Sequence, residues 1–369
     1  MKFFDTSIEK KKVLIALSGG VDSSVSAALL VKEGYDVTAA YMVMYDDPAV
    51  QESCWIEEYR DAVRVAASLG IPIVKFDFTK EYREHVLSYL FDSYSSGNTP
   101  NPDVLCNTYI KFGVWLDKAR ELGFDMLATG HYAQVKKQGE EYFLLQGIDD
   151  NKDQTYFLHQ LNQEKLSRVL FPVGTYTKQR VRELAVSFNL PTAKKKESMG
   201  ICFVGNVSMK DFLKKHISLT PGNIVFYGTD EVIGRHDGLS LYTIGQSHFG
   251  NVSSINKGGD SRSLYVVEKR AHTHELVVGY DDCEKLFTHD VYLSFFHLIS
   301  GVDLHYPVAC KARFRHRQPL QDVVVTRYSD DLIQVHTKDV QRAIVPGQFG
   351  VLYKDGVCLG GGVISSPIT

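Results

Sequence analysis

The feature that most constrains the fold is the stretch VLIALSGGVDSS at residues 13–24. An apolar segment, expected to form a strand over residues 13–17, runs through Ser-Gly-Gly directly into a helix expected over residues 23–33. Glycine lets the backbone approach a ligand closely, and a helix N-terminus offers unpaired N–H groups at the positive end of the helix dipole. The stretch therefore predicts a phosphate-binding loop.

Two better-known phosphate loops do not fit this stretch. No Gly-Lys-Ser/Thr follows the glycines, which excludes a Walker A loop, and the absence of GxGxxG excludes the dinucleotide fingerprint. A plain tight turn between strand and helix is the alternative. The hydroxyl groups of Ser18, Ser23 and Ser24 and the Asp22 carboxylate favour ligand binding over such a turn.

Strands and helices alternate through the first third of the chain. Strands are expected at residues 13–17, 35–42, 71–78 and 125–128, and helices at residues 23–33, 56–69, 80–94 and about 102–122. This alternation predicts a parallel sheet covered on both faces. The stretch 153–196 is expected to be mostly helical. From about residue 218, short alternating segments with Gly and Asp turns predict a small barrel or sandwich.

We therefore expect an α/β chain of three domains. Residues 1–215 form a parallel-sheet nucleotide-binding domain with a helical extension, residues 216–284 a small, mainly β linking domain, and residues 285–369 a C-terminal β-barrel. The net charge of −3 excludes a uniformly basic nucleic-acid-binding protein. The N-terminal residues lack the apolar region of a signal peptide, and no apolar run approaches the ~18 residues of a membrane span. We expect a cytoplasmic protein that enters no membrane.

The six cysteines are widely spaced: Cys54, Cys106, Cys202, Cys283, Cys310 and Cys358. No CxxC pair occurs, which argues against a zinc site or an iron–sulfur cluster of that spacing. We expect no metal site built by protein ligands. Free thiols are mostly buried and inert, and all except Cys106 and Cys202 are interpreted as structural.

The stretch TPNPDVLCN at residues 99–107 places a thiol at the start of a helix. Asn101 fits the N-cap position and Pro102 the first helical position. Asp103 and Cys106 are three residues apart and so face the same side. A helix N-terminus favours the thiolate, whereas a nearby carboxylate opposes it unless Asp103 moves protons on a substrate. Both possibilities indicate a reactive site.

A second thiol, Cys202, lies in AKKKESMGICFVG at residues 193–205. The three lysines would favour a thiolate or persulfide anion if they lie close to it. The alternative is a strand cysteine packed between Ile201 and Phe203, and the local sequence does not decide between the two.

Basic residues concentrate in two places. Residues 164–215 hold eleven Lys and Arg against four acidic residues, which is either a set of solvated helix faces or a footprint for nucleic-acid phosphates. In KARFRHRQ, a continuous strand would place Lys311, Arg313, Arg315 and Arg317 on one face. Like charges in such a row need acids across the sheet or an anionic partner, and we favour RNA.

Taken in order, SGGVDSS, TPNPDVLCN, ATGHY, KDQTYFL, FPVG, TAKKKESMGICFVG, PGQ and CLGGG resemble the bacterial tRNA-specific 2-thiouridylases of the PP-loop ATP-pyrophosphatase superfamily. The resemblance runs from about residue 13 to residue 363. It implies that ATP, assisted by Mg²⁺, adenylylates O2 of the wobble uridine, residue 34 of the tRNA. Persulfide sulfur then attacks C2, AMP departs, and 2-thiouridine remains. The target base must be flipped out to be reached.

The resemblance also carries over individual residues. It implies a persulfide on Cys202, a nucleophile in Cys106 that forms a transient disulfide with Cys202, and an acid/base role for Asp103. Asn101, Pro102 and Asp103 would meet the target base. ATP-binding residues would be Ala16, Leu17, Ser18, Gly19, Gly20, Val21, Asp22, Ser23, Met42 and Gly130. Residues implied to contact tRNA are His131, Lys152, Asp153, Gln154, Arg315, His316 and Gln348. A cysteine desulfurase or a sulfur-relay protein would supply the sulfur.

The chain departs from the family pattern at two points. Ser247-His248 stands where relatives commonly have Arg-Lys, so a basic contact is lost, and His316 stands where they have Tyr, which still permits ring stacking. A ligase or amidotransferase of the same superfamily, acting on a small-molecule carbonyl or carboxylate, is the alternative function. Two cysteines within motifs argue against it. A catalytically idle tRNA-binding or thiol-sensing module is a third reading, and the intact SGGVDSS argues against that.

Overall fold

The computed structural model describes residues 10–46, 55–196, 208–247 and 262–365. Its first sheet has the strand order β3-β2-β1-β4-β7, and all neighbouring strands are parallel. The strands are β1 (Lys12–Ala16), β2 (Asp36–Val43), β3 (Ile73–Asp77), β4 (Met126–Ala128) and β7 (Val169–Leu170). The predicted parallel sheet is confirmed. Its strand order reverses between β1 and β4, the place where sheets of this type bind ligands at their carboxyl edge.

Successive residues of β1 point into two different cores, as expected for a strand buried on both faces. Val13 and Ile15 pack with α1 (Val21–Lys32), α2 (Trp55–Leu69) and α8 (Lys178–Ser187). Leu14 packs on the other face, against two long helical segments. These segments are α3 (Thr79–Tyr82), η1 (Arg83–Leu87) and α4 (Ser88–Ser95), followed by α5 (Pro102–Leu105), η2 (Cys106–Val114) and α6 (Trp115–Glu121).

The region after β4 differs from the expectation that residues 153–196 are mostly helical. It holds only short helical pieces besides α8: η3 (Thr155–Phe157) and α7 (Gln163–Leu166). A hairpin of β5 (Ala133–Gln138) and β6 (Glu141–Gln146), which sequence reasoning missed, precedes them. Polar contacts to the distant barrel hold this region in place, such as the Tyr156 hydroxyl donating to the Phe349 carbonyl at 3.0 Å.

The central part of the chain forms a separate four-stranded sheet of order β10-β11-β8-β9. Its strands are β8 (Gly222–Phe226), β9 (Val232–His236), β10 (Leu264–Arg270) and β11 (Glu275–Tyr280). The short helix α9 (Met209–His216) precedes this sheet, and η4 (Leu239–Leu241) follows β9. Phe212 of α9 stacks on Phe91 of α4, which joins this part to the first domain.

The C-terminal part is a closed barrel, after the turn η5 (Glu284–Leu286). Its six strands are β12 (Phe287–Leu298), β13 (Val308–Arg313), β14 (Gln321–Ser329), β15 (Leu332–Arg342), β16 (Phe349–Lys354) and β17 (Val357–Ser365). Pairing of β12 with β17 closes the ring, which decides between the barrel and the sandwich. The hairpin of the first domain extends the same sheet, because β6 pairs with β17.

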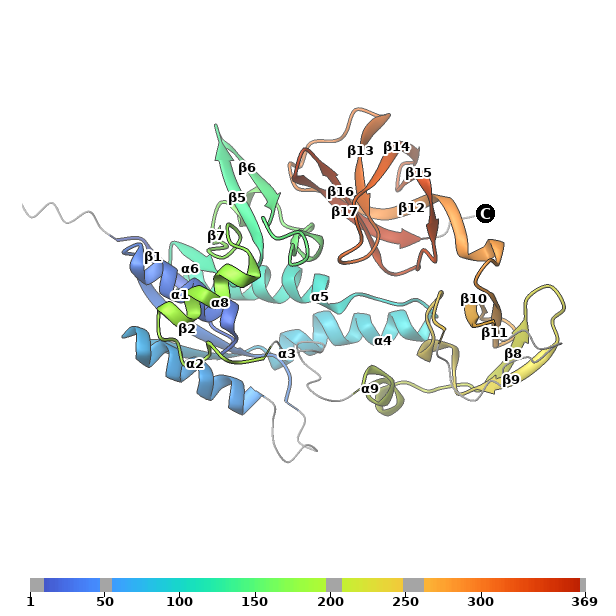
Figure 1. Cartoon of the computed structure of the whole chain (residues 1–369), viewed down its shortest axis with the longest axis horizontal. Coiled ribbons are helices and arrows are strands. Elements are labelled where there is room, and N and C mark those ends of the chain that lie inside the picture. The colour runs from blue at the N-terminus through green and yellow to red at the C-terminus, as the bar shows by residue number, and fades with distance from the viewer. Residues whose placement is uncertain (1–9, 47–54, 197–207, 248–261, 366–369) are drawn as a thin grey trace, which may run out of the picture.

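Figure 1 shows the parallel sheet with its helices at one end of the molecule and the barrel and central sheet at the other. Helix α4 runs between them toward the central sheet, and its Tyr94 carbonyl accepts a hydrogen bond from Ser240 at 2.7 Å. No helix in the described ranges is long and apolar enough to cross a membrane.

Candidate active site

The loop between β1 and α1 is held by its own hydroxyl groups. The Ser18 and Ser23 hydroxyls lie 3.1 Å apart, and those of Ser23 and Ser24 donate to the Gly20 carbonyl at 3.1 and 2.6 Å. Gly19 has φ +72°, and a Cβ there would lie 2.4 Å from the Glu58 carbonyl oxygen, so only glycine fits. The N–H groups of the first turn of α1 have no partners within the helix and face the carboxyl edge of the sheet.

Gly130 brings the end of β4 against this helix N-terminus. A Cβ at position 130 would lie 2.7 Å from the Ser23 amide nitrogen, so a side chain here would fill the space in front of the first turn. Of the predicted ATP residues, Ala16 is the last residue of β1 and Leu17 follows it into the loop. Met42 lies one strand away on β2 and is buried in the apolar core that also contains Leu14.

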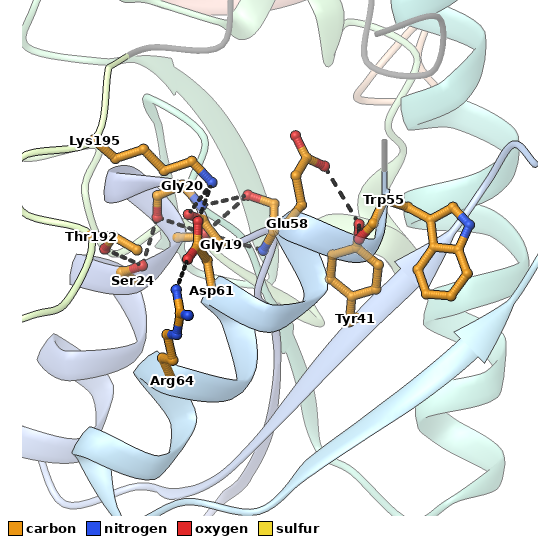
Figure 2. Close-up of polar contacts among 12 residues, drawn as sticks. Gly19, Gly20, Ser24, Tyr41, Trp55, Glu58, Asp61, Arg64, Thr192 and Lys195 are labelled. Carbon is orange, nitrogen blue, oxygen red and sulfur yellow. Dashed lines mark hydrogen bonds and ion pairs between the residues drawn. The ribbon is translucent and has the colours of Figure 1, made fainter. Parts of the chain in front are cut away.

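Two lysines from the second half of the first domain complete the surroundings of the loop. Nζ of Lys178 lies 2.7 and 2.8 Å from the carboxylate oxygens of Asp22, and the Tyr132 hydroxyl donates to the same carboxylate at 2.7 Å. On the other side, Nζ of Lys195 donates to the Gly19 carbonyl at 3.1 Å and to Asp61 at 2.7 Å (Figure 2). Two ammonium groups therefore flank the loop.

The sequence allowed two readings of both lysines, as part of solvated helix faces or of a footprint for nucleic-acid phosphates, and the structure places them beside the loop between β1 and α1. Their partners in the loop lie 156 and 176 residues away along the chain, so no local pattern could have paired them. Several other basic residues of that stretch are also engaged within the molecule: Arg180 with Glu183, Lys210 and Lys214 with Asp237, and Arg182 with the Lys195 carbonyl.

Carboxylates of α2 back the loop on the side of Lys195. Burial raises the pKa of Glu58, against the opposing effect of the nearby Lys195 ammonium. The Tyr41 hydroxyl donates to the Trp55 carbonyl at 3.1 Å and lies 3.5 Å from Glu58, and burial raises the pKa of this tyrosine (Figure 2). Among the described residues, no group of three His, Cys, Asp or Glu side chains could hold a metal ion.

The stretch TPNPDVLCN forms the helix start that the sequence predicts. Asn101 is the N-cap of α5 and Pro102 its first residue, although the Asn101 side chain does not cap the helix. Its amide donates instead to Gln348 of the barrel, at 3.3 Å. The side chain of Gln348 in turn donates to the carbonyls of Thr99 and Pro100 at 2.8 and 3.2 Å, so its amide is engaged at both ends.

Cys106 is buried at the point where α5 passes into the π-helical segment η2. Its Sγ lies 3.6 Å from Sδ of Met44, which directly follows β2, so the thiol and the loop both lie at the carboxyl edge of the first sheet. Burial raises the pKa of Asp103, against the opposing effect of Lys111. Sequence reasoning missed Lys111, although it lies only four residues after the end of TPNPDVLCN.

The second predicted thiol, Cys202, lies outside the described residues, as do Cys54 and His248. The structure describes the chain up to Lys196 on one side of Cys202 and from Ser208 on the other. Ser247 is described, at the end of the segment after η4.

The residues predicted to contact tRNA fall into two groups by burial. His131 is buried beside Phe112 and Phe171, and burial lowers its pKa well below the usual value, so its imidazole is neutral. Asp153 is also buried and forms an ion pair with Arg313 at 2.9 Å. The more exposed members are Lys152, Gln154, Arg315, His316 and Gln348. Of these, Gln154 accepts a hydrogen bond from the Tyr132 N–H at 3.0 Å.

The expectation of four basic side chains on one strand face is wrong. Strand β13 ends at Arg313, and Arg317 has φ +64° in the turn that follows. Lys311 pairs with Asp322 on the neighbouring strand at 2.7 Å, and Arg313 pairs with Asp153 of the first domain, so acids compensate the two basic residues that lie on β13. Arg315 donates to the carbonyls of Arg342 and Ala343.

The turn after β13 still forms a basic surface. A pocket of about 370 Å³ is lined by Arg315, His316, Arg317, Gln318, Arg342 and Ile344. Burial lowers the pKa of His316 to about 4, and its ring lies 4.4 Å from that of Phe157. The basic character of this end of the barrel therefore comes from arginines.

Comparisons with known proteins cover nearly the whole chain. Three family models match: the tRNA methyl transferase HUP domain over residues 11–206, the tRNA methyl transferase PRC-barrel domain over 210–280 and the aminomethyltransferase beta-barrel domain over 288–364. The chain is 44% identical over 358 residues to the tRNA-specific 2-thiouridylase MnmA of Listeria monocytogenes serovar 1/2a. It is 43% identical over 365 residues to the protein of the same name from Bacillus licheniformis. Each alignment covers 96% of this chain and 95% of the relative.

Among solved structures, the U34-tRNA thiolase of Methanococcus maripaludis aligns with a TM-score of 0.35 and 18% identity, over 56% of this chain and 63% of that one. This likeness is too weak to bear on function. The alignments to the curated relatives, in contrast, extend through all three sheets.

Proposed function

The chain belongs to the tRNA-specific 2-thiouridylase family, and from this premise we propose that it transfers sulfur to C2 of uridine 34 of tRNA, converting ATP to AMP and diphosphate. The observation that carries the proposal is a shared location. The phosphate-binding loop after β1 and the Cys106 thiol, in contact with Met44 after β2, lie at the same edge of one sheet. An activated base and a sulfur-handling thiol can therefore meet there.

ATP fits the loop by charge and by shape. The N–H groups of the first turn of α1 suit the phosphates, and the ammonium groups of Lys178 and Lys195 lie on either side. Gly130 leaves the space in front of the helix free of a side chain. Attack of uracil O2 on the α-phosphate releases diphosphate and makes O2 part of an AMP leaving group. Without this activation the oxygen would be a poor leaving group.

Sulfur transfer then requires two thiols. The outer sulfur of a persulfide on Cys202 attacks C2 of the uracil, and AMP leaves with the former O2. The Cys106 thiolate attacks the Cys202 sulfur, so the S–S bond of the persulfide breaks and a Cys106–Cys202 disulfide forms. A reductant must reopen this disulfide before the next turnover. Asp103 suits the proton transfers at the uracil, because burial raises its pKa and so brings it closer to neutral pH than the pKa of an ordinary aspartate.

Mg²⁺ belongs to the proposal as a companion of the triphosphate. The Asp22 carboxylate, the acidic group of the loop, is engaged by Lys178 and Tyr132, and the described residues offer no cluster of three ligands. Mg²⁺ commonly binds through substrate phosphates with few protein ligands, which is compatible with this site.

The tRNA contacts we propose are those with exposed or partly exposed side chains: Lys152, Gln154, Arg315, His316 and Gln348. The burial of His131 and Asp153 favours indirect roles for these two residues. We also propose the domain limits 1–215, 216–284 and 285–369, a cytoplasmic location, and a cysteine desulfurase or sulfur-relay protein as the sulfur donor.

The test is nucleoside mass spectrometry of unmodified tRNA incubated with the protein, ATP, Mg²⁺ and a cysteine desulfurase with cysteine. We expect 2-thiouridine at position 34 and one AMP for each base modified. Absence of 2-thiouridine, with AMP release stimulated by a small amide or carboxylate acceptor, would instead favour the ligase alternative.

Cysteine variants test the roles of the thiols. Cys106→Ser and Cys202→Ser should each abolish thiolation while ATP binding persists. Cys283→Ser is the matched control, because this partly buried thiol lies in the central part of the chain. Full thiolation by either of the first two variants would exclude the two-thiol mechanism.

A further inference from the structure

The connector between α4 and α5 comprises residues 96–101. It ends at Asn101, the first of the residues proposed to meet the target base. Helix α4 ends in a Schellman motif: Gly97 has φ +81°, its N–H donates to the Tyr94 carbonyl at 3.0 Å, and the Asn98 N–H donates to the Ser93 carbonyl at 2.9 Å. The carbonyl groups that follow lie at the negative end of the helix dipole. The position of this connector sets where Asn101 and Pro102 begin.

The central part of the chain forms hydrogen bonds with the connector and with the end of α4. Lys269, on β10, donates from Nζ to the Gly97 carbonyl at 2.9 Å. Two hydroxyl contacts lie beside it, because Ser240 donates to the Tyr94 carbonyl at 2.7 Å and Thr243 Oγ1 lies 3.3 Å from Thr99 Oγ1. An ammonium group near a helix C-terminus is favourably placed against the dipole.

The barrel contacts the same connector at Thr99, two residues after Gly97. The Thr99 N–H donates to the Pro346 carbonyl at 3.1 Å, next to the contacts of Gln348. Gly347 has φ +90°, and a Cβ there would lie 3.0 Å from Asn98 Cβ and 3.1 Å from the Thr99 nitrogen, so the backbones are in close contact. The connector is thus fixed from both downstream parts of the molecule.

The lysine contact is made at a cost. Burial lowers the pKa of Lys269 to about 8, so the surroundings disfavour its charged form. A flexible, charged side chain is normally left in solvent unless a partner compensates for its burial. The Gly97 carbonyl at the end of α4 is that partner.

We propose that Lys269 is a positioning residue for uridine thiolation, which fixes the Gly97 carbonyl and through it the segment that carries Asn101, Pro102 and Asp103. The inference rests on the proposed function. It gives a catalytic purpose to the central sheet, which contains none of the site residues predicted from sequence. Lys269 touches neither base nor nucleotide and acts through the connector.

The test compares Lys269→Met with Lys269→Arg and with Lys285→Met, a control at an exposed lysine after the same sheet. Lys269→Met should lower kcat for 2-thiouridine formation about tenfold, with KM for tRNA and the Kd for ATP unchanged, because one charge-assisted hydrogen bond is lost. Lys269→Arg should restore most of kcat, and Lys285→Met should behave as wild type. Wild-type kcat in Lys269→Met, or a raised KM for tRNA alone, would overturn the proposal.

Hydrogen exchange gives a readout that does not depend on activity. In Lys269→Met, the amides of residues 97–99 should exchange faster than in wild type, while those of β1 should not change. Thr243→Val should raise the same rates more weakly, and it serves if Lys269→Met does not fold. Unchanged exchange in both variants would overturn the positioning role. A wild-type protein that makes no 2-thiouridine but shows the expected exchange would overturn only the proposed function.

Discussion

The loop between β1 and α1 and the end of strand β13 both concentrate polar and charged groups, but they use them in opposite ways. In the loop, the Ser23 and Ser24 hydroxyls donate to the Gly20 carbonyl, and the first N–H groups of α1 have no partner within the helix. At β13, Lys311 forms an ion pair with Asp322, and Arg313 forms one with Asp153. Charged side chains are paired within the chain in both regions, so the backbone amides at the start of α1, and not the charges alone, distinguish the loop as a ligand site.

Gly130→Val should have the largest effect of the variants considered, because it changes the surroundings of the loop between β1 and α1. The side chain would enter the space in front of Ser23, because its Cβ alone would lie 2.7 Å from the Ser23 amide nitrogen. We expect ATP-dependent AMP release to fall by about a hundredfold or more, because the phosphates can no longer approach the helix. Normal AMP release from a folded variant would mean that ATP does not bind at this N-terminus.

Arg313→Leu should destabilise the protein by removing the buried ion pair at the end of β13. It leaves the buried carboxylate of Asp153 without its cation, which typically costs about 3–5 kcal/mol of unfolding free energy. Urea denaturation measures the loss. The control Lys311→Leu removes an exposed pair with Asp322, worth about 0–1 kcal/mol. Equal losses in both variants would contradict the distinction between buried and exposed cations on β13.

Lys178→Met should sharpen the nucleotide assignment. Removing the ammonium group beside Asp22 loses a charge-assisted contact of about 1.5–3 kcal/mol, so we expect AMP formation to fall about ten- to a hundredfold. Lys178→Arg should recover part of the rate, and Lys118→Met on the exposed face of α6 should have no effect. Loss of tRNA affinity without loss of AMP formation would return Lys178 to the tRNA footprint.

Arg317→Gln should give the smallest effect. Arg317 is exposed in the turn after β13 and lines the basic pocket. If RNA phosphates approach there, the slope of log affinity for tRNA against log salt should fall by about one, with little change in stability. Filter binding at several salt concentrations measures this slope. An unchanged slope would remove this turn from the tRNA surface.

The first sheet could be predicted from the sequence because each strand, loop and helix is a local pattern. The helix start at Asn101-Pro102 was predicted for the same reason. The hairpin β5–β6 left a local signal that was missed, a Gly at position 139 with φ +61° between two alternating segments. The irregular region after it could not be predicted, because contacts such as Asp153–Arg313, 160 residues apart, decide its shape.

The same limit applies to the site. The loop residues and Asp103 with Cys106 could be found from motif spacing. The contacts of Lys178 and Lys195 with the loop could not be predicted, because a lysine-rich stretch looks the same whether its ammonium groups face a tRNA or a loop far away in sequence. The engagement of Gln348 with Asn101, 247 residues apart, was hidden for the same reason.

The pairing of β6 with β17 has a consequence for synthesis on the ribosome. Leu144 and Leu145 of β6 pair with Cys358 and Val357, near the end of the described chain. Strand β6 emerges with this edge unpaired, and more than half of the chain must be translated after it before Val357 and Cys358 are available. Unpaired edges of this kind promote association between nascent chains. Ribosome pausing during translation of the barrel would therefore prolong the lifetime of an aggregation-prone intermediate. The need for chaperones should be greatest in that interval.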